Sequence, residues 1–143
     1  MAKKEVDNRF SKFGTVSFAA SSKVNDFIDY LEKGKVMATK CKGCSMVFFP
    51  PRADCCSCLS SDMEWIEVAG EGKLISFSKL KYGPTGFEDD LPYTIAVADF
   101  GEVKVFGRMS KEIPDDDITI GMSVKVSPVN LSNEKIAHEF MRA

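Results

Sequence analysis

The sequence predicts a mainly β protein with an N-terminal helix, a metal-binding ribbon and a C-terminal five-stranded barrel. Two observations predict this fold class. All five cysteines of the 143-residue chain fall within residues 41–58. After residue 70 the chain reads as short alternating segments separated by Gly, Pro and Asp, which is typical of a small barrel.

Composition narrows the function classes before any motif is considered. Apolar residues make up 44% and charged residues 28%, as in ordinary globular domains, and the net charge is −2. That balance gives no overall attraction to polyanions, so nucleic acid is not an expected partner. Because no apolar run reaches the about 18 residues of a membrane span, and the first residues lack the apolar core of a secretory signal, we expect a cytoplasmic protein without membrane contact.

The N-terminal helix is predicted over residues 22–33. Apolar side chains there recur at the spacing of one helical face, and they are Val24, Phe27, Ile28 and Leu31. Ser22 is the predicted N-cap, Lys33 lies in the last turn, and Gly34 ends the helix. Residues 1–20 before it are read as an arm that packs on another surface.

Five strands are predicted in the C-terminal half, over residues 73–82, 94–100, 102–109, 123–129 and 135–142. In the third, Val103, Val105 and Met109 alternate with charged residues, so one face points inward. Residues 94–100 are apolar on both faces and predict a central strand. Residues 135–142 also fit a helical face, although a strand is favoured. Five short strands in this length are typical of the OB-fold.

The cysteines form two CxxC pairs, Cys41 with Cys44 and Cys55 with Cys58, separated by ten residues. Two such turns facing each other supply four thiolates to one tetrahedral ion, and zinc prefers that geometry. Four protein ligands leave no position for water, so the metal is predicted to be structural. Iron also accepts this ligand set, and sequence does not separate the two ions. A redox dithiol pair is less favoured because it lacks a βαβ context.

Cys56 is a fifth cysteine inside the second pair, without the spacing of a ligand. We interpret it as a spare thiol, since a nucleophile needs a base and His138, the one histidine, is distant in sequence. His138 alternates with Ile136 and Phe140, so it is predicted to lie in the barrel wall. The predicted domains are therefore an arm and amphipathic helix (1–36), a rubredoxin-like zinc ribbon (37–68) and an OB-fold domain (69–143).

The order of these motifs resembles a known family. The chain reads CKGC, FPPR, CCSC, MEWIEVAGEGKLISFS, LPYTIAVADF and IGMSVKV in succession over about residues 22–130. This set is similar to the acyl-CoA-associated zinc-ribbon/OB-fold proteins, long catalogued as a domain of unknown function. The matching positions are the four cysteines of the CxxC pairs with Pro50, Pro51, Arg52, Gly70, Gly72, Pro92 and Tyr93. Cys56 and Ser45 depart from the family, which usually has proline and glycine there, so both turns are expected to be looser.

The resemblance implies a function as well as a fold. Members of the family resemble small, non-catalytic partner subunits of thiolase-fold enzymes, including acetoacetyl-CoA thiolases, steroid side-chain aldolases and an aromatic succinyl-CoA thiolase. It implies that Cys41, Cys44, Cys55 and Cys58 hold the zinc, that this chain bridges subunits in a hetero-oligomer, and that its OB domain helps to bind the acyl-CoA.

Binding CoA requires cations near its phosphates and an apolar channel for the acyl part. By that chemistry the candidate CoA-binding or partner-facing residues are Arg52, Lys79, Lys81, Phe87 and Arg108, and the loop over residues 82–93 is expected to border a ligand channel. Solvated strand faces are the plainer reading of the same side chains. A further expectation is that the aromatic residues outside the barrel core mark a protein interface, namely Phe10, Phe13, Phe18, Phe48 and Phe49.

Two other function classes compete with a binding subunit. Both OB-folds and zinc ribbons occur in nucleic-acid-binding modules, where Phe77, Tyr82 and Phe106 would supply stacking surfaces, but the acidic runs FEDD and PDDD disfavour a polyanion. A stand-alone enzyme is the weakest reading because no catalytic triad, phosphate loop or open metal position is visible. We therefore expect a zinc-stabilised, non-catalytic subunit of a thiolase-type complex.

Overall fold

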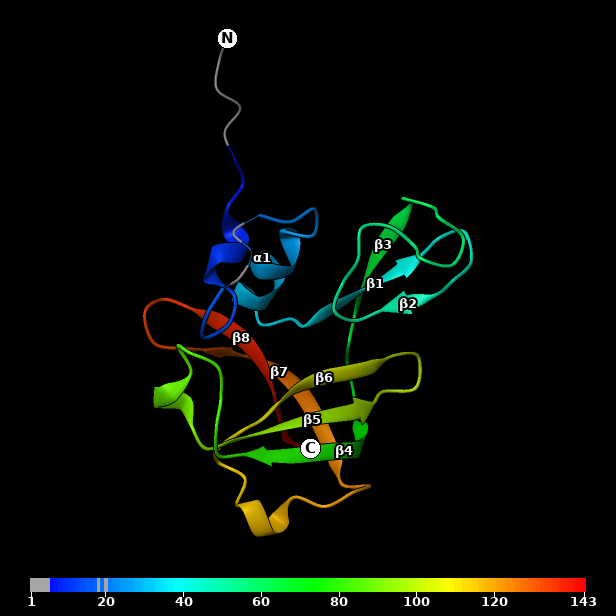
Figure 1. The fold of residues 1–143 in the computed structure, drawn as a ribbon. Helices are drawn as coiled ribbons and strands as arrows, with labels where there is room; N and C mark the ends of the chain where they lie inside the picture. Colours follow the sequence, from blue (N-terminus) through cyan, green and yellow to red (C-terminus); the bar gives the residue numbers. More distant parts are fainter. Residues whose placement is uncertain (1–5, 18, 20) are drawn as a thin grey trace.

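A computed structural model describes residues 6–17, 19 and 21–143 of the chain. Figure 1 shows the N-terminal segments and the ribbon on one side of a β-barrel. The helical elements are η1 (Arg9–Lys12), α1 (Asp26–Glu32), η2 (Glu88–Asp90) and η3 (Asp115–Asp117). The ribbon strands are β1 (Met37–Cys41), β2 (Val47–Phe48) and β3 (Met63–Glu67). The barrel strands are β4 (Gly72–Leu80), β5 (Tyr93–Asp99), β6 (Lys104–Met109), β7 (Ser123–Asn130) and β8 (Ile136–Arg142).

The N-terminal helix α1 starts four residues later than the sequence pattern predicts. The hydroxyl of Ser22 accepts a hydrogen bond from the Val24 N–H, and the Asn25 side-chain oxygen accepts one from the Ser22 N–H. These contacts form a turn ahead of the helix, so the prediction of Ser22 as the helix N-cap was wrong and Asn25 takes that position. The predicted stop is confirmed, because Gly34 adopts a φ of 87° that favours glycine.

The apolar face of α1 is buried as predicted. Phe27, Ile28 and Leu31 are each only 1% exposed and pack with Val36 and Ile136. The helix therefore lies against β8 and the start of the ribbon, as Figure 1 also shows. This cluster, separate from the barrel core, holds helix, ribbon base and barrel together.

The ribbon is a three-stranded antiparallel sheet in the order β2-β1-β3. Strand β1 pairs with β3 along its whole length, from Met37 opposite Glu67 to Cys41 opposite Met63. The ribbon's own core cluster is small and contains Cys41, Cys55 and Phe48, with Met63 packed against them. So small a core cannot stabilise a sheet alone, which is why the cysteine cluster matters for folding.

The remaining strands form a closed barrel in the order β4-β5-β6-β8-β7. Neighbouring strands are antiparallel except for β6 and β8, which run parallel. This is the five-stranded barrel that the sequence predicts, and β5 is central between β4 and β6 as expected. Residues 135–142, which fitted both strand and helix, form strand β8.

The barrel interior is filled by aliphatic and aromatic side chains. Leu74, Val105, Val124 and Phe140 are fully buried, and Met109 is nearly so. The alternation predicted for residues 102–109 is thus confirmed, since Val105 and Met109 point inward while Lys104 is exposed. Ala38 of β1 and Val68 after β3 join the same core, so the ribbon is anchored to the barrel at its base.

The N-terminal arm, residues 6–17, packs on its own chain. The Phe13 ring lies 5.7 Å from Phe27 and stacks on His138 at 6.0 Å, and the Gly14 N–H donates to the Ile136 carbonyl at 2.8 Å. Phe10 also packs on Phe27. Arg9 forms ion pairs with Asp7, Asp26 and Asp29, which tie the arm to α1.

The aromatic residues outside the barrel were expected to be exposed and to mark an interface, but four of them are at least partly covered within the chain. Phe10, Phe13 and Phe49 are half-buried in the cluster around α1, and Phe48 is buried in the ribbon. Helix α1 and β8 offer apolar surface to Phe10, Phe13 and Phe49, which composition alone does not reveal. Phe18 lies outside the described residues. Within residues 6–17, 19 and 21–143, no helix has both the length and the apolar character to cross a membrane.

Candidate functional site

Four cysteine sulfurs gather at the end of the ribbon that lies away from its base. The Sγ atoms of Cys41, Cys44, Cys55 and Cys58 all lie within 4.8 Å of one another. Cys41 to Cys58 is 3.4 Å and Cys44 to Cys55 is 3.5 Å. A tetrahedral zinc–thiolate site with bonds of about 2.3 Å places its sulfurs about 3.8 Å apart, so the cluster has the size of such a site.

The two CxxC turns have the same backbone geometry. The Cys41 N–H donates to the Met46 carbonyl, and the Ser45 N–H donates to the Cys41 carbonyl, both at 2.8 Å. In the second turn the Cys55 N–H donates to the Ser60 carbonyl at 2.8 Å, and the Leu59 N–H donates to the Cys55 carbonyl at 3.1 Å.

Both turns end on a residue in the left-handed region, with φ of 67° at Ser45 and 63° at Leu59. That conformation favours glycine, which explains why the resembling family usually has glycine at the position of Ser45.

Backbone N–H groups in these turns point at the sulfurs. The N–H groups of Cys58 and Ser57 lie 3.5 and 3.4 Å from Cys55 Sγ. They lower the pKa of the Cys55 thiol to about 6, and the backbone N–H of Cys44 likewise lowers the pKa of Cys41. Each turn therefore favours a thiolate, the form that binds metal, at its first cysteine. Although backbone N–H groups act in the opposite direction, contacts with the neighbouring sulfurs raise the pKa of Cys44 and of Cys58, the second cysteine of each turn.

The donor set fits a structural metal ion. All four positions of a tetrahedron would be filled by protein sulfur, leaving none for water or substrate. Cys41 and Cys55 are buried, whereas Cys44 and Cys58 face solvent and close the site from outside. Cys56 is exposed and is not part of the four-sulfur cluster, as its spacing predicted.

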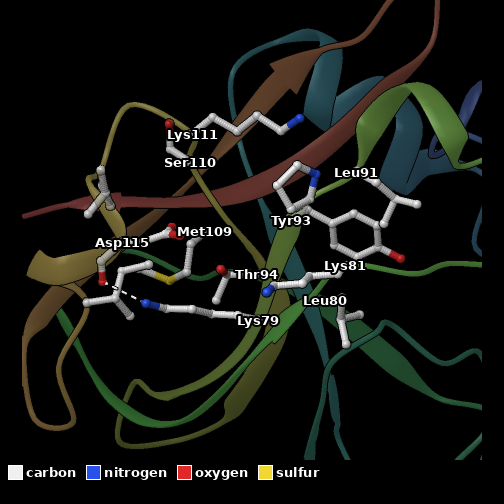
Figure 2. A pocket seen from close by; sticks show the side chains of 13 residues that line it. Lys79, Leu80, Lys81, Leu91, Tyr93, Thr94, Met109, Ser110, Lys111 and Asp115 are labelled. Atoms are coloured by element: carbon white, nitrogen blue, oxygen red, sulfur yellow. Dashed lines mark hydrogen bonds between the residues drawn. The ribbon is translucent and has the colours of Figure 1, made fainter.

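A basic cavity of about 460 Å³ opens at one end of the barrel. Figure 2 shows Lys79, Lys81 and Lys111 among the side chains that line it, together with Tyr93 and Met109, and the Lys79 ammonium group at the Asp115 carbonyl. Its lining residues are Lys79, Leu80, Lys81, Leu91, Pro92, Tyr93, Thr94, Met109, Ser110, Lys111, Ile113, Asp115 and Ile118. Three lysines and one aspartate give this wall a formal charge of +2.

The lysines keep their charge available. Lys79 donates to the backbone carbonyl of Asp115 at 3.2 Å, and Lys111 donates to that of Asp90 at 2.7 Å. None of the three lysines forms an ion pair with another described residue. Carbonyl contacts orient an ammonium group without neutralising it, so the cavity can attract an anion.

A second, apolar cavity of about 640 Å³ lies between the arm and the barrel. It is lined by Phe10, Phe13, Gly14, Thr15, Val16, Ser17, Ala19, Leu80, Pro84, Phe87, Tyr93, Ile95, Phe106, Gly107, Arg108, Ala137 and His138. Leu80 and Tyr93 also line the basic cavity, so the two adjoin. The loop over residues 82–93 contributes side chains to both cavities, and its role at a ligand channel stays a prediction.

Arg108 lies at the edge of the apolar cavity and is held by internal contacts. Its guanidinium donates to the Asp90 carboxylate at 3.0 Å and to the Thr15 hydroxyl at 2.9 Å, and it lies 5.2 Å over the Tyr93 ring. Thr15 in turn donates to Asp90. Although burial raises it, hydrogen bonds from Thr15 and Arg108 hold the pKa of Asp90 below its usual value.

His138 lies in strand β8, as predicted for a wall residue. Its Nε2 lies 2.8 Å from the Phe106 carbonyl, and the rings of Phe13, Phe27 and Phe49 surround it. Burial lowers the pKa of His138, so the ring is neutral near pH 7 with Nε2 as the donor. Its Nδ1 is buried without a partner among the described residues.

The five residues predicted to contact CoA or a partner separate into three places. Lys79 and Lys81 line the basic cavity, whereas Phe87 and Arg108 line the apolar one. Arg52 lines neither; it is exposed on the ribbon, 5.4 Å from the Phe48 ring.

Sequence reasoning missed Lys111, Thr15 and Asp90. The position of Lys111 directly after a strand that carries Arg108 was an available signal, whereas Thr15 is brought in only by tertiary folding.

Two protein-family models match adjoining parts of the chain. The rubredoxin-like zinc ribbon domain of ChsH2 matches residues 29–64, and the C-terminal OB-fold domain of ChsH2 matches residues 65–128. Together they span the ribbon and most of the barrel.

Curated relatives agree with this match. A DUF35 domain-containing scaffold protein of Methanocaldococcus jannaschii is 33% identical over 98 residues, which is 66% of this chain and 67% of the relative. The benzoylsuccinyl-CoA thiolase subunit BbsA of Geobacter metallireducens is 26% identical over 98 residues, covering 68% of this chain and 65% of that subunit.

Solved structures show the same fold. The Ltp2-ChsH2(DUF35) aldolase superposes with a TM-score of 0.63 at 24% identity, over 80% of this chain and 91% of that chain. A DUF35-family protein of unknown function from Sulfolobus solfataricus superposes with a TM-score of 0.56 at 17% identity, over 93% of this chain and 90% of that chain. With its four-cysteine ribbon and its five-stranded OB barrel, the chain belongs to the ChsH2/DUF35 family.

Proposed function

We propose that this chain is a non-catalytic, zinc-binding subunit of a cytoplasmic thiolase-type complex, in which it bridges subunits and helps to bind the acyl-CoA. One observation carries the proposal. The similarity to a benzoylsuccinyl-CoA thiolase subunit and to DUF35 scaffold proteins extends over about two thirds of the chain. The reaction would be cleavage or formation of a carbon–carbon bond in an acyl-CoA, performed by a thiolase-fold partner.

The metal site supports a structural role. Zinc held by Cys41, Cys44, Cys55 and Cys58 would stabilise a ribbon whose own apolar core is small. Among the described residues, the one histidine is buried among aromatic rings and engaged with the Phe106 carbonyl, so it is poorly placed as a general base. Catalytic groups are therefore assigned to the partner enzyme.

The two adjoining cavities support the acyl-CoA part of the proposal. CoA has a polyanionic nucleotide end, and the basic cavity presents Lys79, Lys81 and Lys111 without ion-pair partners among the described residues. Phe87 and Arg108 line the apolar cavity next to it, and the exposed Arg52 on the ribbon is assigned to the partner-facing surface.

Purification of the tagged protein from its own host tests the proposal. We expect a thiolase-fold protein to co-purify in fixed stoichiometry and to lose activity when this chain is removed. A Cys58→Ser variant should recover less of that partner, whereas Cys56→Ser, which changes a thiol outside the cluster, should recover as much as wild type. Recovery of the chain alone, or with RNA, would contradict the subunit role.

A further inference from the structure

We propose that the apolar cavity between the N-terminal arm and the barrel binds the acyl group of the CoA thioester, and that it selects an acyl group without charge. The inference rests on the proposed function, because it identifies the class of acyl-CoA and places its two ends. The nucleotide phosphates lie at the basic cavity and the acyl group lies beneath the arm.

The arrangement of the two cavities fits a ligand with one charged and one apolar end. They meet at Leu80 and Tyr93, which line both. On one side of this boundary lie three lysines, and on the other lie the rings of Phe10, Phe13, Phe87 and Phe106. A free nucleotide would satisfy only the basic side, and a fatty acid carries a single negative charge for three lysines, whereas an acyl-CoA brings several phosphate charges and an apolar acyl group. A volume of about 640 Å³ lies within the range of small-ligand pockets, about 300–1,000 Å³.

The charged groups at the apolar cavity are already paired within the chain. Arg108 and Asp90 form an ion pair at 3.0 Å, which Thr15 completes through hydrogen bonds to both. His138 is neutral near pH 7 because burial lowers its pKa. An acyl group with its own carboxylate would therefore be buried there without a counter-charge, and that is costly. The cavity thus discriminates against a carboxylated acyl group.

The walls of the apolar cavity come entirely from this chain. Val16 in the arm packs on Gly86 in the loop, where an added Cβ would lie 2.5 Å from Val16 Cγ2. The arm is further joined to the barrel by Gly14, whose N–H donates to Ile136, and by Lys135, which donates to the Ser11 carbonyl at 2.7 Å. The arm, the loop and β6 thus supply walls on several sides of the cavity, so the isolated chain is expected to bind the acyl group.

Equilibrium binding to the isolated, zinc-loaded full chain tests this inference. The probes are octanoyl-CoA, octanedioyl-CoA and CoA, which share one nucleotide and differ only in the acyl end. We expect octanoyl-CoA to bind at least tenfold more tightly than the other two by calorimetry. Equal affinity for octanoyl-CoA and octanedioyl-CoA, equal affinity for octanoyl-CoA and CoA, or no binding of any of them would overturn the inference.

Paired variants assign the two ends. Phe106→Asp places a charge at the apolar cavity and should weaken octanoyl-CoA at least tenfold while leaving CoA unchanged. Ile120→Asp makes the same change at an exposed side chain that lines neither cavity, and should leave both affinities unchanged. The double variant Lys81→Gln with Lys111→Gln should weaken the binding of all three ligands. The control variant Lys125→Gln, on β7, should leave their affinities unchanged. A Phe106→Asp variant that weakens CoA as much as octanoyl-CoA would contradict the assignment.

These results are distinguishable from failure of the proposed function. Selective binding of octanoyl-CoA by a chain that co-purifies with no enzyme would leave the site intact and remove the subunit role. A chain that co-purifies with a thiolase-fold enzyme but shows no acyl preference would support the subunit role and overturn the assignment of the acyl site.

Discussion

Arg108 on strand β6 donates a hydrogen bond of 2.9 Å to Thr15, a residue 93 positions earlier in the N-terminal arm. Both side chains also contact the carboxylate of Asp90 in the loop between β4 and β5. The three residues, which we call the arm pin, connect segments that are otherwise joined by few polar contacts. Arm, loop and barrel are therefore held in one arrangement around the apolar cavity.

Removing the arm pin is expected to lower the stability of the N-terminal arm. Arg108→Met keeps most of the apolar stem but removes the donors, leaving Asp90 and Thr15 without their partner. Because hydrogen bonds to charged groups contribute about 1.5–3 kcal/mol and this pair is partly solvated, we expect a loss of about 1–2 kcal/mol in local stability. Hydrogen exchange should show faster exchange over residues 6–17 with little change in β5. Lys104→Met, on the exposed side of the same strand, is the control and should leave the arm unchanged.

The four-sulfur cluster predicts a metal content of one ion per chain. Cys58→Ser should lower the zinc content measured by mass spectrometry, and it should increase hydrogen exchange over residues 37–67. The barrel should keep its protection, because its core of Leu74, Val105, Val124 and Phe140 is independent of the metal.

Cys56→Ser is the matched control for the metal site, since this thiol lies in the same turn outside the cluster. Its zinc content should equal that of the wild type. A visible absorption spectrum distinguishes iron from zinc, which is colourless. Equal metal loss in both serine variants would contradict the assignment of ligands.

His138 predicts a pH dependence of stability. Burial lowers its pKa in the folded protein, so the unfolded chain binds a proton more readily near and below the ordinary value of about 6.5. The contribution of the neutral His138 ring to the free energy of unfolding is complete above pH 6.5. It is lost as the pH falls toward the folded-state pKa. The free energy of unfolding should therefore decrease between pH 7.5 and pH 5.5.

The contribution of His138 is isolated by comparing wild type with His138→Gln at both pH values. The amide can still donate to the Phe106 carbonyl but does not titrate, so the decrease should be smaller in the variant. Denaturant titration followed by Trp65 fluorescence measures the difference. An identical decrease in both proteins would assign the pH dependence to groups other than His138. Glu139 is not one of them, because burial raises its pKa and a raised carboxyl pKa makes stability increase as the pH falls.

The barrel core predicts a large effect at Phe140. This ring is fully buried where β8 meets β6 and β7, and it stacks on Phe100 at 6.5 Å. Phe140→Ala should lower the free energy of unfolding by about 3–5 kcal/mol, because it removes apolar contacts and leaves a cavity. Phe106→Ala on β6 also removes a phenyl ring, but this side chain is 54% exposed, so the loss in the free energy of unfolding should be far smaller. Similar losses in both variants would contradict this core.

Local patterns predicted the parts of the fold that depend on neighbouring residues. The spacing of Phe27, Ile28 and Leu31 defined the buried helix face, and the alternation around Val105 defined the inner face of β6. The start of α1 was placed too early because Ser22 is a good N-cap by type. The competing hydrogen bonds between Ser22, Val24 and Asn25 depend on three-dimensional geometry.

The candidate site was predicted where its chemistry is local. The two CxxC turns specify four converging sulfurs by spacing alone, and the structure brings them together. The cavities are different, since their walls come from segments distant in sequence. Thr15, Asp90 and Arg108 have no sequence relationship that reveals their contact. Lys111 comes near Lys79 because β5 pairs with both β4 and β6. The covering of Phe10 and Phe13 by α1 and β8 was likewise not visible from composition.

The ribbon begins and ends at the same point. The Val68 N–H donates to the Val36 carbonyl at 2.9 Å, immediately outside β1 and β3, so the chain leaves the ribbon where it entered. A segment with adjoining ends behaves as an insertion cassette, because its length can change without altering the distance that the remaining chain must span. We therefore expect ribbons of other lengths to be exchangeable at this junction if they keep Ala38 and Phe49, which pack against the barrel core and the α1 cluster.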